Sequence, residues 1–279
     1  MNFIKMHGLG NDFICLDHFL IPSVADYPEL ARYLCHRQLG VGADGLIVIL
    51  PSDKADVKMR IFNADGSEPE MCGNGIRCLA RYVYEKGYLQ RKSLKIETKA
   101  GILNVGLEIE ENKVKAVKVG MGEPILNPKE IPVLVEGERA LGKELVVLGE
   151  KRVFSAVSMG NPHCILFVED LEEVELEVLG PAIENHPCFP QKTNVEFVVV
   201  ENRRELTMKV WERGVGPTLA CGTGACAVVV AAILEGRTEN EVLVHLPGGD
   251  LKIEWATDNQ IYMTGPAEYV FKGQLWRNK

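Results

Sequence analysis

The chain has 279 residues, of which 46% are hydrophobic and 25% are charged, and its formal net charge is −8. This length allows two domains, each large enough to bury its own core. The acidic balance, without a basic run or a polybasic tail, argues against nucleic acid or an anionic membrane as a partner and favours a small-molecule substrate. We find no apolar run long enough for a signal peptide or a membrane helix. The eight cysteines are therefore expected to be free thiols in a reducing, cytoplasmic compartment.

Short strands punctuated by glycine dominate the expected secondary structure. In chain order, we expect strands at residues 13–19, 45–51, 58–64, 93–101, 102–110, 115–121, 153–160, 164–170, 193–200, 206–213, 241–247 and 251–256. Residues 75–87 have the apolar spacing of an amphipathic helix, whereas residues 224–236 are apolar nearly all round, as in a helix wrapped by a sheet. Gly87 and Gly236 are placed to close these helices in the left-handed conformation. Three prolines make 124–132 the expected linker.

A short sequence motif occurs twice, as MCGNG at residues 71–75 and as ACGTG at residues 220–224. Its two cysteines, Cys72 and Cys221, are 149 positions apart. Each copy of the motif places a cysteine directly before an expected helix, where backbone N–H groups lower a thiol's pKa and attract anions. Nearly the same separation recurs at further landmarks, which pair Asn11 with Asn161, Asp44 with Asn194, Asn63 with Glu212, Gly87 with Gly236, and Gly101 with Gly249. A period this long suits two domains rather than a solenoid.

We therefore expect an α+β fold of two structurally equivalent domains related by pseudo-two-fold symmetry. Each would be a curved, mostly antiparallel β-sheet or barrel around a central helix. The expected N-terminal half, residues 1–118 plus 266–279, carries Cys72, and the C-terminal half, residues 119–265, carries Cys221.

Two thiols presented by equivalent halves suit the inversion of a stereocentre. One thiolate would remove the α-proton of an amino acid from one face, and the other thiol would return a proton from the opposite face. Unpaired N–H groups at the two helix starts would stabilise the charge that develops on the substrate carboxylate. A free cysteine pKa of about 8.5 needs only modest tuning for this role.

Several motifs together resemble those of the diaminopimelate epimerase family over essentially the full length: MHGLGNDF, FNADGSEPEMCGNG, SMGNPHC, TNVEF and WERGVGPTLACGTGACA. The resemblance implies an isomerase that interconverts LL- and meso-2,6-diaminopimelate in lysine biosynthesis, without pyridoxal phosphate, metal or any other cofactor. It implies that Cys72 and Cys221 are the catalytic acid/base pair and that the enzyme is a homodimer.

The resemblance also implies roles for other positions that match the family. Gly73, Asn74, Gly222 and Thr223 would hold the reacting carboxylate at the helix starts. The rest of the substrate would be bound by Asn11, Asn63, Asn161, Asn194, Glu212 and Arg213, and the thiol pKa values would be modulated by His163 and Glu212. Amide, carboxylate and guanidinium groups can bind the ammonium and carboxylate at the distal end of diaminopimelate. One position departs from the family: Gly45 stands where some members have glutamine, so no side-chain contact is carried over there.

Other interpretations remain open from the residues alone. The same fold and paired thiols would serve a proline racemase-like enzyme, although such an enzyme typically has histidine where this chain has Asn74 and has no use for Arg213. A thiol redox or binding protein is a third class. Zinc is disfavoured because no CxxC pair occurs, and the glycine-rich GLGND and GVGADG lack the pattern of a phosphate loop. Without the resemblance, His163 reads as a structural histidine and Glu212-Arg213 as a surface pair.

Overall fold

The structure is a computed structural model that describes residues 1–20 and 24–276. It divides into two compact units, one of Met1–Gly120 with Thr264–Lys279 and the other of Met121–Met263. Residues 277–279 of the expected N-terminal half lie outside the described residues. In the part of the chain that is described, no helix has the length and apolar character that crossing a membrane requires.

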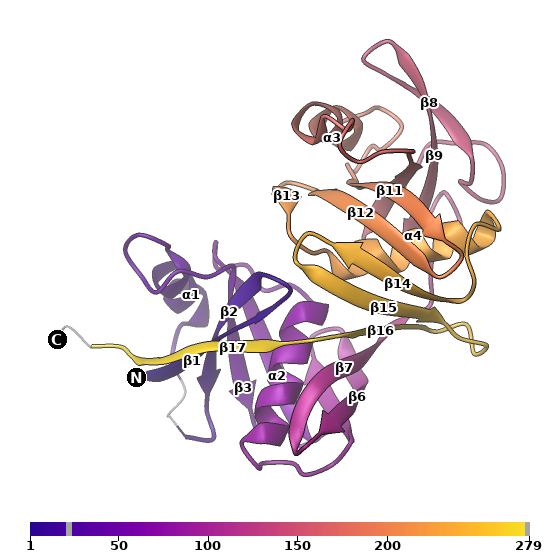
Figure 1. Cartoon of the computed structure of the whole chain (residues 1–279). Helices are drawn as coiled ribbons and strands as arrows, with labels where there is room; N and C mark the ends of the chain where they lie inside the picture. The colour runs from indigo at the N-terminus through magenta and orange to yellow at the C-terminus, as the bar shows by residue number, and fades with distance from the viewer. Residues whose placement is uncertain (21–23, 277–279) are drawn as a thin grey trace. The chain divides into compact units, whose positions relative to one another are not determined.

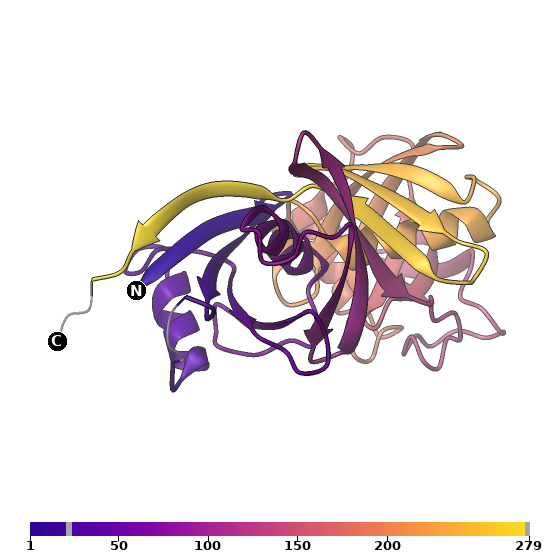
Figure 2. The same cartoon turned by 90° about the horizontal axis from the view of Figure 1, so that it is seen from below.

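The first unit is a sheet of eight strands with two helices. Its strands are β1 (Asn2–Gly8), β2 (Asn11–Asp17), β3 (Gly45–Leu50), β4 (Val57–Asn63), β5 (Ser93–Thr98), β6 (Gly101–Glu110), β7 (Lys113–Gly122, ending just past the unit boundary) and β17 (Glu268–Gln274). The helices are α1 (Tyr27–Cys35) and α2 (Gly73–Glu85). The strand order is β17-β1-β2-β3-β4-β5-β6-β7. Figures 1 and 2 show β17, in yellow, beside the indigo β1.

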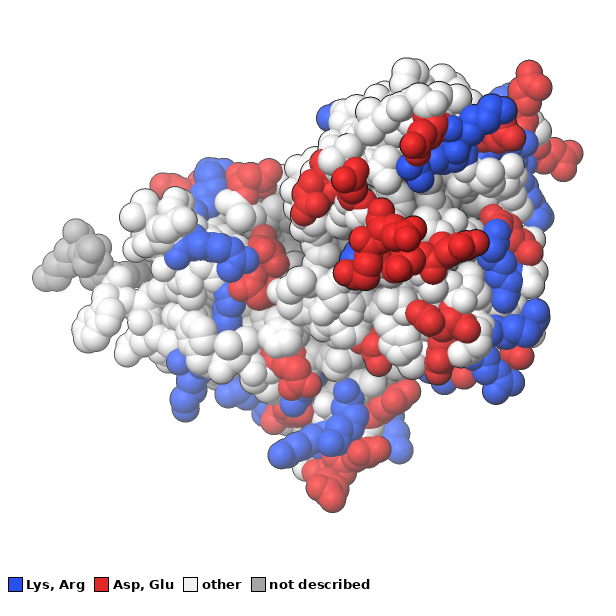
Figure 3. All heavy atoms as spheres, turned by 45° about the horizontal axis from the view of Figure 1, so that its top comes forward, with Lys and Arg blue, Asp and Glu red and all other residues white. Residues whose placement is uncertain are grey.

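The second unit has the same kind of sheet. Its strands are β8 (Lys143–Val147), β9 (Glu150–Ser158), β10 (Pro162–Phe167), β11 (Asn194–Asn202), β12 (Glu205–Glu212), β13 (Gly216–Thr218), β14 (Glu241–Leu246), β15 (Gly249–Trp255) and most of β16 (Ile261–Gly265). The helices are α3 (Leu176–Glu184) and α4 (Gly222–Leu234). Acidic side chains gather on the face shown in Figure 3, in keeping with the net charge of −8.

The pairing sequence of five strands is identical in the two units. β1, β2, β3, β4 and β5 pair in turn as antiparallel, parallel, antiparallel and parallel neighbours. β9, β10, β11, β12 and β14 repeat this sequence of directions. The duplication expected from the repeated motif is therefore seen as the same order and direction of strands in both units. The expected α+β class, with a sheet around a central helix in each half, is confirmed.

The two central helices are present as predicted, but each begins and ends two residues earlier than the expected ranges 75–87 and 224–236. Cys72 and Cys221 are the N-cap residues, both with extended backbone and neither with a side-chain cap bond. Gly87 and Gly236 follow the C-caps with φ values of 77° and 71°, as expected of left-handed helix ends. Nine residues of α4 are buried, which agrees with its apolar sequence.

Each sheet is covered on a second face by a helix that the sequence analysis did not predict. In the first unit, Leu46 and Val48 of β3 pack with Leu34 of α1, while the alternate residue Ile47 approaches Gly75 of α2. In the second unit, Val195 and Phe197 of β11 pack with residues of α3. Burial on both faces explains why these strands read as almost continuous apolar runs.

Three further expectations are corrected by the structure. Strands β1, β8, β13, β16 and β17 were not expected, because short or partly polar segments give little periodic signal. The proline-punctuated stretch is not a free linker, since Ile131 and Val133 belong to the core of the second unit. Finally, the register places Gly45, not Asp44, at the position of Asn194: Phe13 pairs with Gly45, and His163 with Asn194.

Candidate active site

The Cys72 cluster consists of Cys72, Asn11 and Asn74, at the start of α2 in the first unit. Sγ of Cys72 lies 3.8 Å from Oδ1 of Asn11, which also accepts a hydrogen bond of 3.1 Å from Nδ2 of Asn74. Gly73 and Asn74 form the first turn of the helix, whose leading N–H groups have no partner within a helix. Oδ1 of Asn74 is buried without a hydrogen-bond partner. This end of the helix thus offers unmet polar groups beside a thiol.

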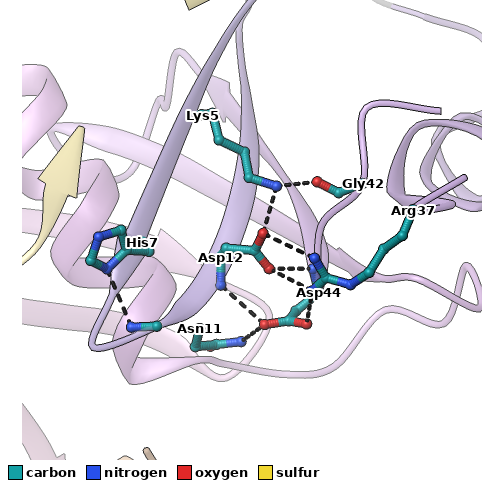
Figure 4. Close-up of polar contacts among 8 residues, drawn as sticks. Lys5, His7, Asn11, Asp12, Arg37, Gly42 and Asp44 are labelled. Atoms are coloured by element: carbon teal, nitrogen blue, oxygen red, sulfur yellow. Dashed lines mark hydrogen bonds and ion pairs between the residues drawn. The ribbon is translucent and has the colours of Figure 1, made fainter. Parts of the chain in front are cut away.

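A charged network behind the cluster fixes Asn11 (Figure 4). Oδ2 of Asp44 accepts from Nδ2 of Asn11 at 2.9 Å and from the backbone N–H of Asp12 at 3.0 Å. Arg37 contacts both carboxylates, at 3.0 Å from Asp12 and 2.8 Å from Asp44. Lys5, buried to 6% exposure, donates to Asp12 at 2.6 Å and to the carbonyl of Gly42. Asn11 is therefore held with its carbonyl towards Cys72.

The ionisation of Asp12 agrees with this network. Burial alone would raise the pKa of Asp12, but hydrogen bonds from Lys5 and Arg37 outweigh it, so the pKa lies below its ordinary value. A charged Asp12 keeps the buried Lys5 paired.

Asn63, a predicted substrate-binding residue, pairs in the β3–β4 ladder with Gly45, where no side-chain contact was expected. Nδ2 of Asn63 donates to Oγ of Ser67 at 2.9 Å, within its own turn. At Gly45, a Cβ would lie 2.9 Å from the backbone oxygen of Phe62, so this backbone leaves no room for the glutamine of other members.

The Cys221 cluster is a chain of side chains in the second unit. Cys221 is 5% exposed, and its Sγ lies 3.6 Å from Oγ1 of Thr223. Nδ2 of Asn161 donates to Oγ1 of Thr223 at 3.3 Å. Oδ1 of Asn161 lies 3.1 Å from Nε2 of His163, and Nδ1 of His163 lies 2.6 Å from Oε1 of Glu196. The predicted residues Asn161, His163, Thr223 and Cys221 are thus brought together, and Glu196 joins them.

The other predicted residues of this unit lie at the neighbouring strand ends. Asn194 starts β11, and its Oδ1 accepts from the backbone N–H of Arg213 at 2.9 Å. Oε1 of Glu212, the last residue of β12, accepts from the Thr218 hydroxyl at 2.5 Å. The guanidinium of Arg213 donates to the carbonyl of Gln191 at 3.2 Å. Gly222 opens α4 beside Cys221.

The environment of Cys221 favours the protonated thiol in this structure. Burial raises its pKa well above the ordinary value, and the charges of Glu212 and Glu196 raise it further. The Thr223 hydroxyl and the backbone N–H of Gly224 act in the opposite direction. Removal of the thiol proton therefore depends on the hydrogen bonds that reach Sγ.

Four residues that matter here were not predicted. Asp12, Arg37 and Lys5 support Asn11 through contacts distant in sequence, for which no local signal exists. Glu196 had a signal, since a lone carboxylate inside the apolar run VEFVVV must find a partner when buried.

The chain matches known proteins over nearly its full length. A family model described as diaminopimelate epimerase matches residues 3–127 and 155–270. The chain is similar to a diaminopimelate epimerase of Desulfitobacterium hafniense, with 65% identity over 277 residues that cover 99% of this chain and 98% of the relative. A diaminopimelate epimerase of Moorella thermoacetica is 54% identical over 276 residues, 99% of both chains.

A solved structure shares the fold at much lower identity. A probable proline racemase from Agrobacterium radiobacter superposes with a TM-score of 0.72 at 14% identity, covering 99% of this chain and 92% of that one. At this identity the likeness concerns the fold alone.

Proposed function

The chain belongs to the diaminopimelate epimerase family and is an isomerase, and we propose that it interconverts LL- and meso-2,6-diaminopimelate with Cys72 and Cys221 as its two acid/base groups. The observation that carries this proposal is the repeated placement of a cysteine as the N-cap residue of a central helix, once in each unit. The reaction is a step of lysine biosynthesis.

The proposed chemistry balances with two thiols and no further group. One thiolate takes the α-proton of the substrate, so that an S–H bond forms and the C–H electron pair moves onto the α-carbon and its carboxylate. The other thiol gives its proton to the opposite face and becomes a thiolate. Neither cysteine forms a covalent bond to the substrate, and neither pyridoxal phosphate nor a metal is needed in this scheme.

The helix starts supply the electrostatic part of the proposal. N–H groups at Gly73, Asn74, Gly222 and Thr223 would hold the reacting carboxylate and stabilise its enediolate-like charge. This term grows as the proton leaves, because negative charge then accumulates on the oxygens. The leading N–H groups of a helix have no partner within the helix, which supports this assignment.

The distal end of diaminopimelate carries a second ammonium and a second carboxylate. We assign its binding to Asn11, Asn63, Asn161, Asn194, Glu212 and Arg213, and we assign modulation of thiol pKa to His163 and Glu212. Glu212 supports the latter, because its charge raises the pKa of Cys221.

A proline racemase-like activity is the alternative within the same fold. It is disfavoured by the relatives that are 54% and 65% identical over nearly the whole chain, both of which are diaminopimelate epimerases. Arg213 and the asparagines would also have no partner on proline.

The test is turnover in deuterium oxide. With a reductant and a metal chelator and without added cofactor, the protein should exchange the α-hydrogen of LL-diaminopimelate and yield a mixture of meso and LL forms. Proton NMR follows the exchange, and chiral chromatography follows the inversion. Activity on proline with neither exchange nor inversion of diaminopimelate would overturn the proposal.

We also propose that the enzyme is a homodimer. Three neighbouring residues of β17 are apolar and substantially exposed, Tyr269 by 37%, Val270 by 53% and Phe271 by 48%. Contiguous exposed apolar side chains often mark protein interfaces. Light scattering should give about twice the chain mass of 30.9 kDa, and a monomer at micromolar concentration would contradict the proposal.

A cytoplasmic location is proposed for the same enzyme. None of the eight cysteines, all of which lie within the described residues, forms a disulfide, and thiols persist in a reducing compartment. Fractionation of producing cells should recover the protein with cytoplasmic markers, and recovery with exported proteins would contradict this assignment.

A further inference from the structure

The second unit contains a buried acid–base pair at two positions whose equivalents in the first unit are apolar residues. His163 and Glu196 are both fully buried and joined at 2.6 Å. By strand register and helix contact, their counterparts are Phe13 and Ile47. A Cβ on Gly75 of α2 would meet Ile47, and a Cβ on Gly224 of α4 would meet Oε1 of Glu196 at 2.7 Å. Glu196 therefore takes the place of an isoleucine directly beneath the start of α4.

Asn161 presents its carbonyl oxygen Oδ1 to Nε2 of His163, and because this oxygen only accepts, Nε2 carries a hydrogen. One further hydrogen then lies between Nδ1 of His163 and Oε1 of Glu196, which are 2.6 Å apart. If the proton stays on Glu196, the carboxyl donates to Nδ1 and the neutral ring carries its hydrogen on Nε2. If the proton moves to His163, both ring nitrogens carry hydrogen. In either form Nε2 is a donor, and the pair has no net charge.

The donor at Nε2 sets the direction of the hydrogen bonds that follow. It donates to Oδ1 of Asn161, which turns the amide nitrogen of Asn161 towards Oγ1 of Thr223. Because Oγ1 then accepts, the hydroxyl hydrogen of Thr223 is available to Sγ of Cys221 at 3.6 Å. A donor at this position stabilises the thiolate.

We propose that Glu196 is a positioning residue for Cys221, which acts through His163 and Asn161 to make the Thr223 hydroxyl donate to the Cys221 sulfur. The proposal depends on the proposed function only in taking Cys221 as a reacting thiol. Glu196 itself touches no substrate in this scheme.

The charges around Cys221 do not produce the same effect. Glu196 on β11, Glu212 on β12 and His163 on β10 are the titratable groups facing it, and both carboxylates act to raise its pKa. Burial raises the pKa of Glu196, and His163 acts in the opposite direction. The proton-sharing pair is indicated by geometry, since Oδ1 of Asn161 accepts from Nε2 and Oε1 of Glu196 lies 2.6 Å from Nδ1. Replacing Glu196 by an uncharged residue therefore changes the hydrogen bonds more than the net charge.

The buried oxygen Oε2 of Glu196 distinguishes two substitutions, because it has no hydrogen-bond partner. In Glu196→Gln, the NH₂ group avoids this position, since two unmet donors cost more than one unmet carbonyl. The amide nitrogen then donates to Nδ1 and keeps the hydrogen on Nε2. Glu196→Ile, which copies Ile47 of the first unit, leaves Nδ1 without a partner.

The experiment measures how fast methyl methanethiosulfonate, a small thiol reagent, labels each cysteine at pH 8 in the full-length protein without substrate. Peptide mass spectrometry resolves Cys221 from Cys72, which serves as an internal control. Glu196→Ile should slow the labelling of Cys221 about tenfold, the effect of losing one hydrogen bond to a charged sulfur, and leave Cys72 unchanged. Glu196→Gln should stay within about threefold of the wild type.

A double-mutant cycle with Thr223→Val separates the proposed chain from altered packing. If Glu196 acts through the Thr223 hydroxyl, Glu196→Ile should add almost nothing in the Thr223→Val background. Additive effects, an unchanged Cys221 rate in Glu196→Ile, or a tenfold loss in Glu196→Gln would each overturn the proposal. The Glu196→Gln result decides alone if Glu196→Ile does not fold.

Turnover gives a separate readout. In an active enzyme, kcat for inversion should fall about tenfold in Glu196→Ile and recover in Glu196→Gln. If the wild type does not invert diaminopimelate but the labelling pattern holds, the proposed function fails and the role of Glu196 stands. If inversion occurs and the labelling pattern is absent, the reverse applies.

Discussion

Cys72→Ala and Cys221→Ala should each lower the rate of diaminopimelate inversion by about a thousandfold or more, because each removes one of the two groups that move the proton. A one-base mechanism would retain activity in one of the two variants. Neither cysteine is one of the strong N-cap residues, so alanine should cost little at these positions and both variants should fold. Inversion followed by chiral chromatography is the measurement.

The matched control for this pair is Cys78→Ala. Cys78 lies in the same helix as Cys72 but is fully buried, and burial raises the pKa of its thiol to about 12. It should lose stability through a small cavity and keep its kcat. Full inversion activity in either Cys72→Ala or Cys221→Ala would refute the two-thiol scheme.

Gly224→Ala should lower both activity and stability. The added methyl group would lie 2.7 Å from Oε1 of Glu196 and 3.3 Å from Cβ and Sγ of Cys221. Glu196 is held by His163 in a fully buried position and cannot swing away, so the start of α4 must shift. We expect a loss of about 1–3 kcal/mol in the free energy of unfolding and on the order of a hundredfold in kcat.

Gly75→Ala is the counterpart in the first unit. There the methyl group would meet the terminal carbons of Ile47 and Ile61, both at 3.2 Å, which can move by rotation, and it would make an ordinary contact of 3.7 Å with Cβ of Cys72. A gain of up to about 1 kcal/mol in helix propensity offsets much of this strain. Thermal unfolding of both variants should show the larger loss in Gly224→Ala, and equal losses would mean that Glu196 does not confine this position.

Local signals predicted the parts of the fold that lie near the chemistry. The helix beginning after each cysteine and the glycine ending it depend on neighbouring residues, and both were predicted. The pairing of β17 with β1 joins residues more than 260 positions apart, and no periodicity predicts it. Helices α1 and α3 were not predicted, because the sequence pattern indicated mainly strands, with helical spacing recognised only in the two central helices.

The candidate site, like the fold, could be predicted only in part. Motifs indicated which residues to examine, but the direction in which Asn11 points depends on Asp44 and Arg37, whose contacts come from folding. The assumed match of Asp44 with Asn194 was displaced by one residue, because the offset between the halves is 150 at Phe13 and His163 but already 149 where the third strand of each half begins, at Gly45 and Asn194. A strand shifted by one residue presents the opposite side chains to the helix.

The exchange of Phe13 and Ile47 for His163 and Glu196 bears on how such a chain can evolve. An assembly of two copies of the first half would carry two thiols, each near the same apolar residues. An assembly of two copies of the second half would carry two thiols, each near the same buried His–Glu pair. Only a chain with one of each gives its thiols different surroundings. Because the halves differ at these buried positions, neither half can be replaced by a second copy of the other without losing that difference.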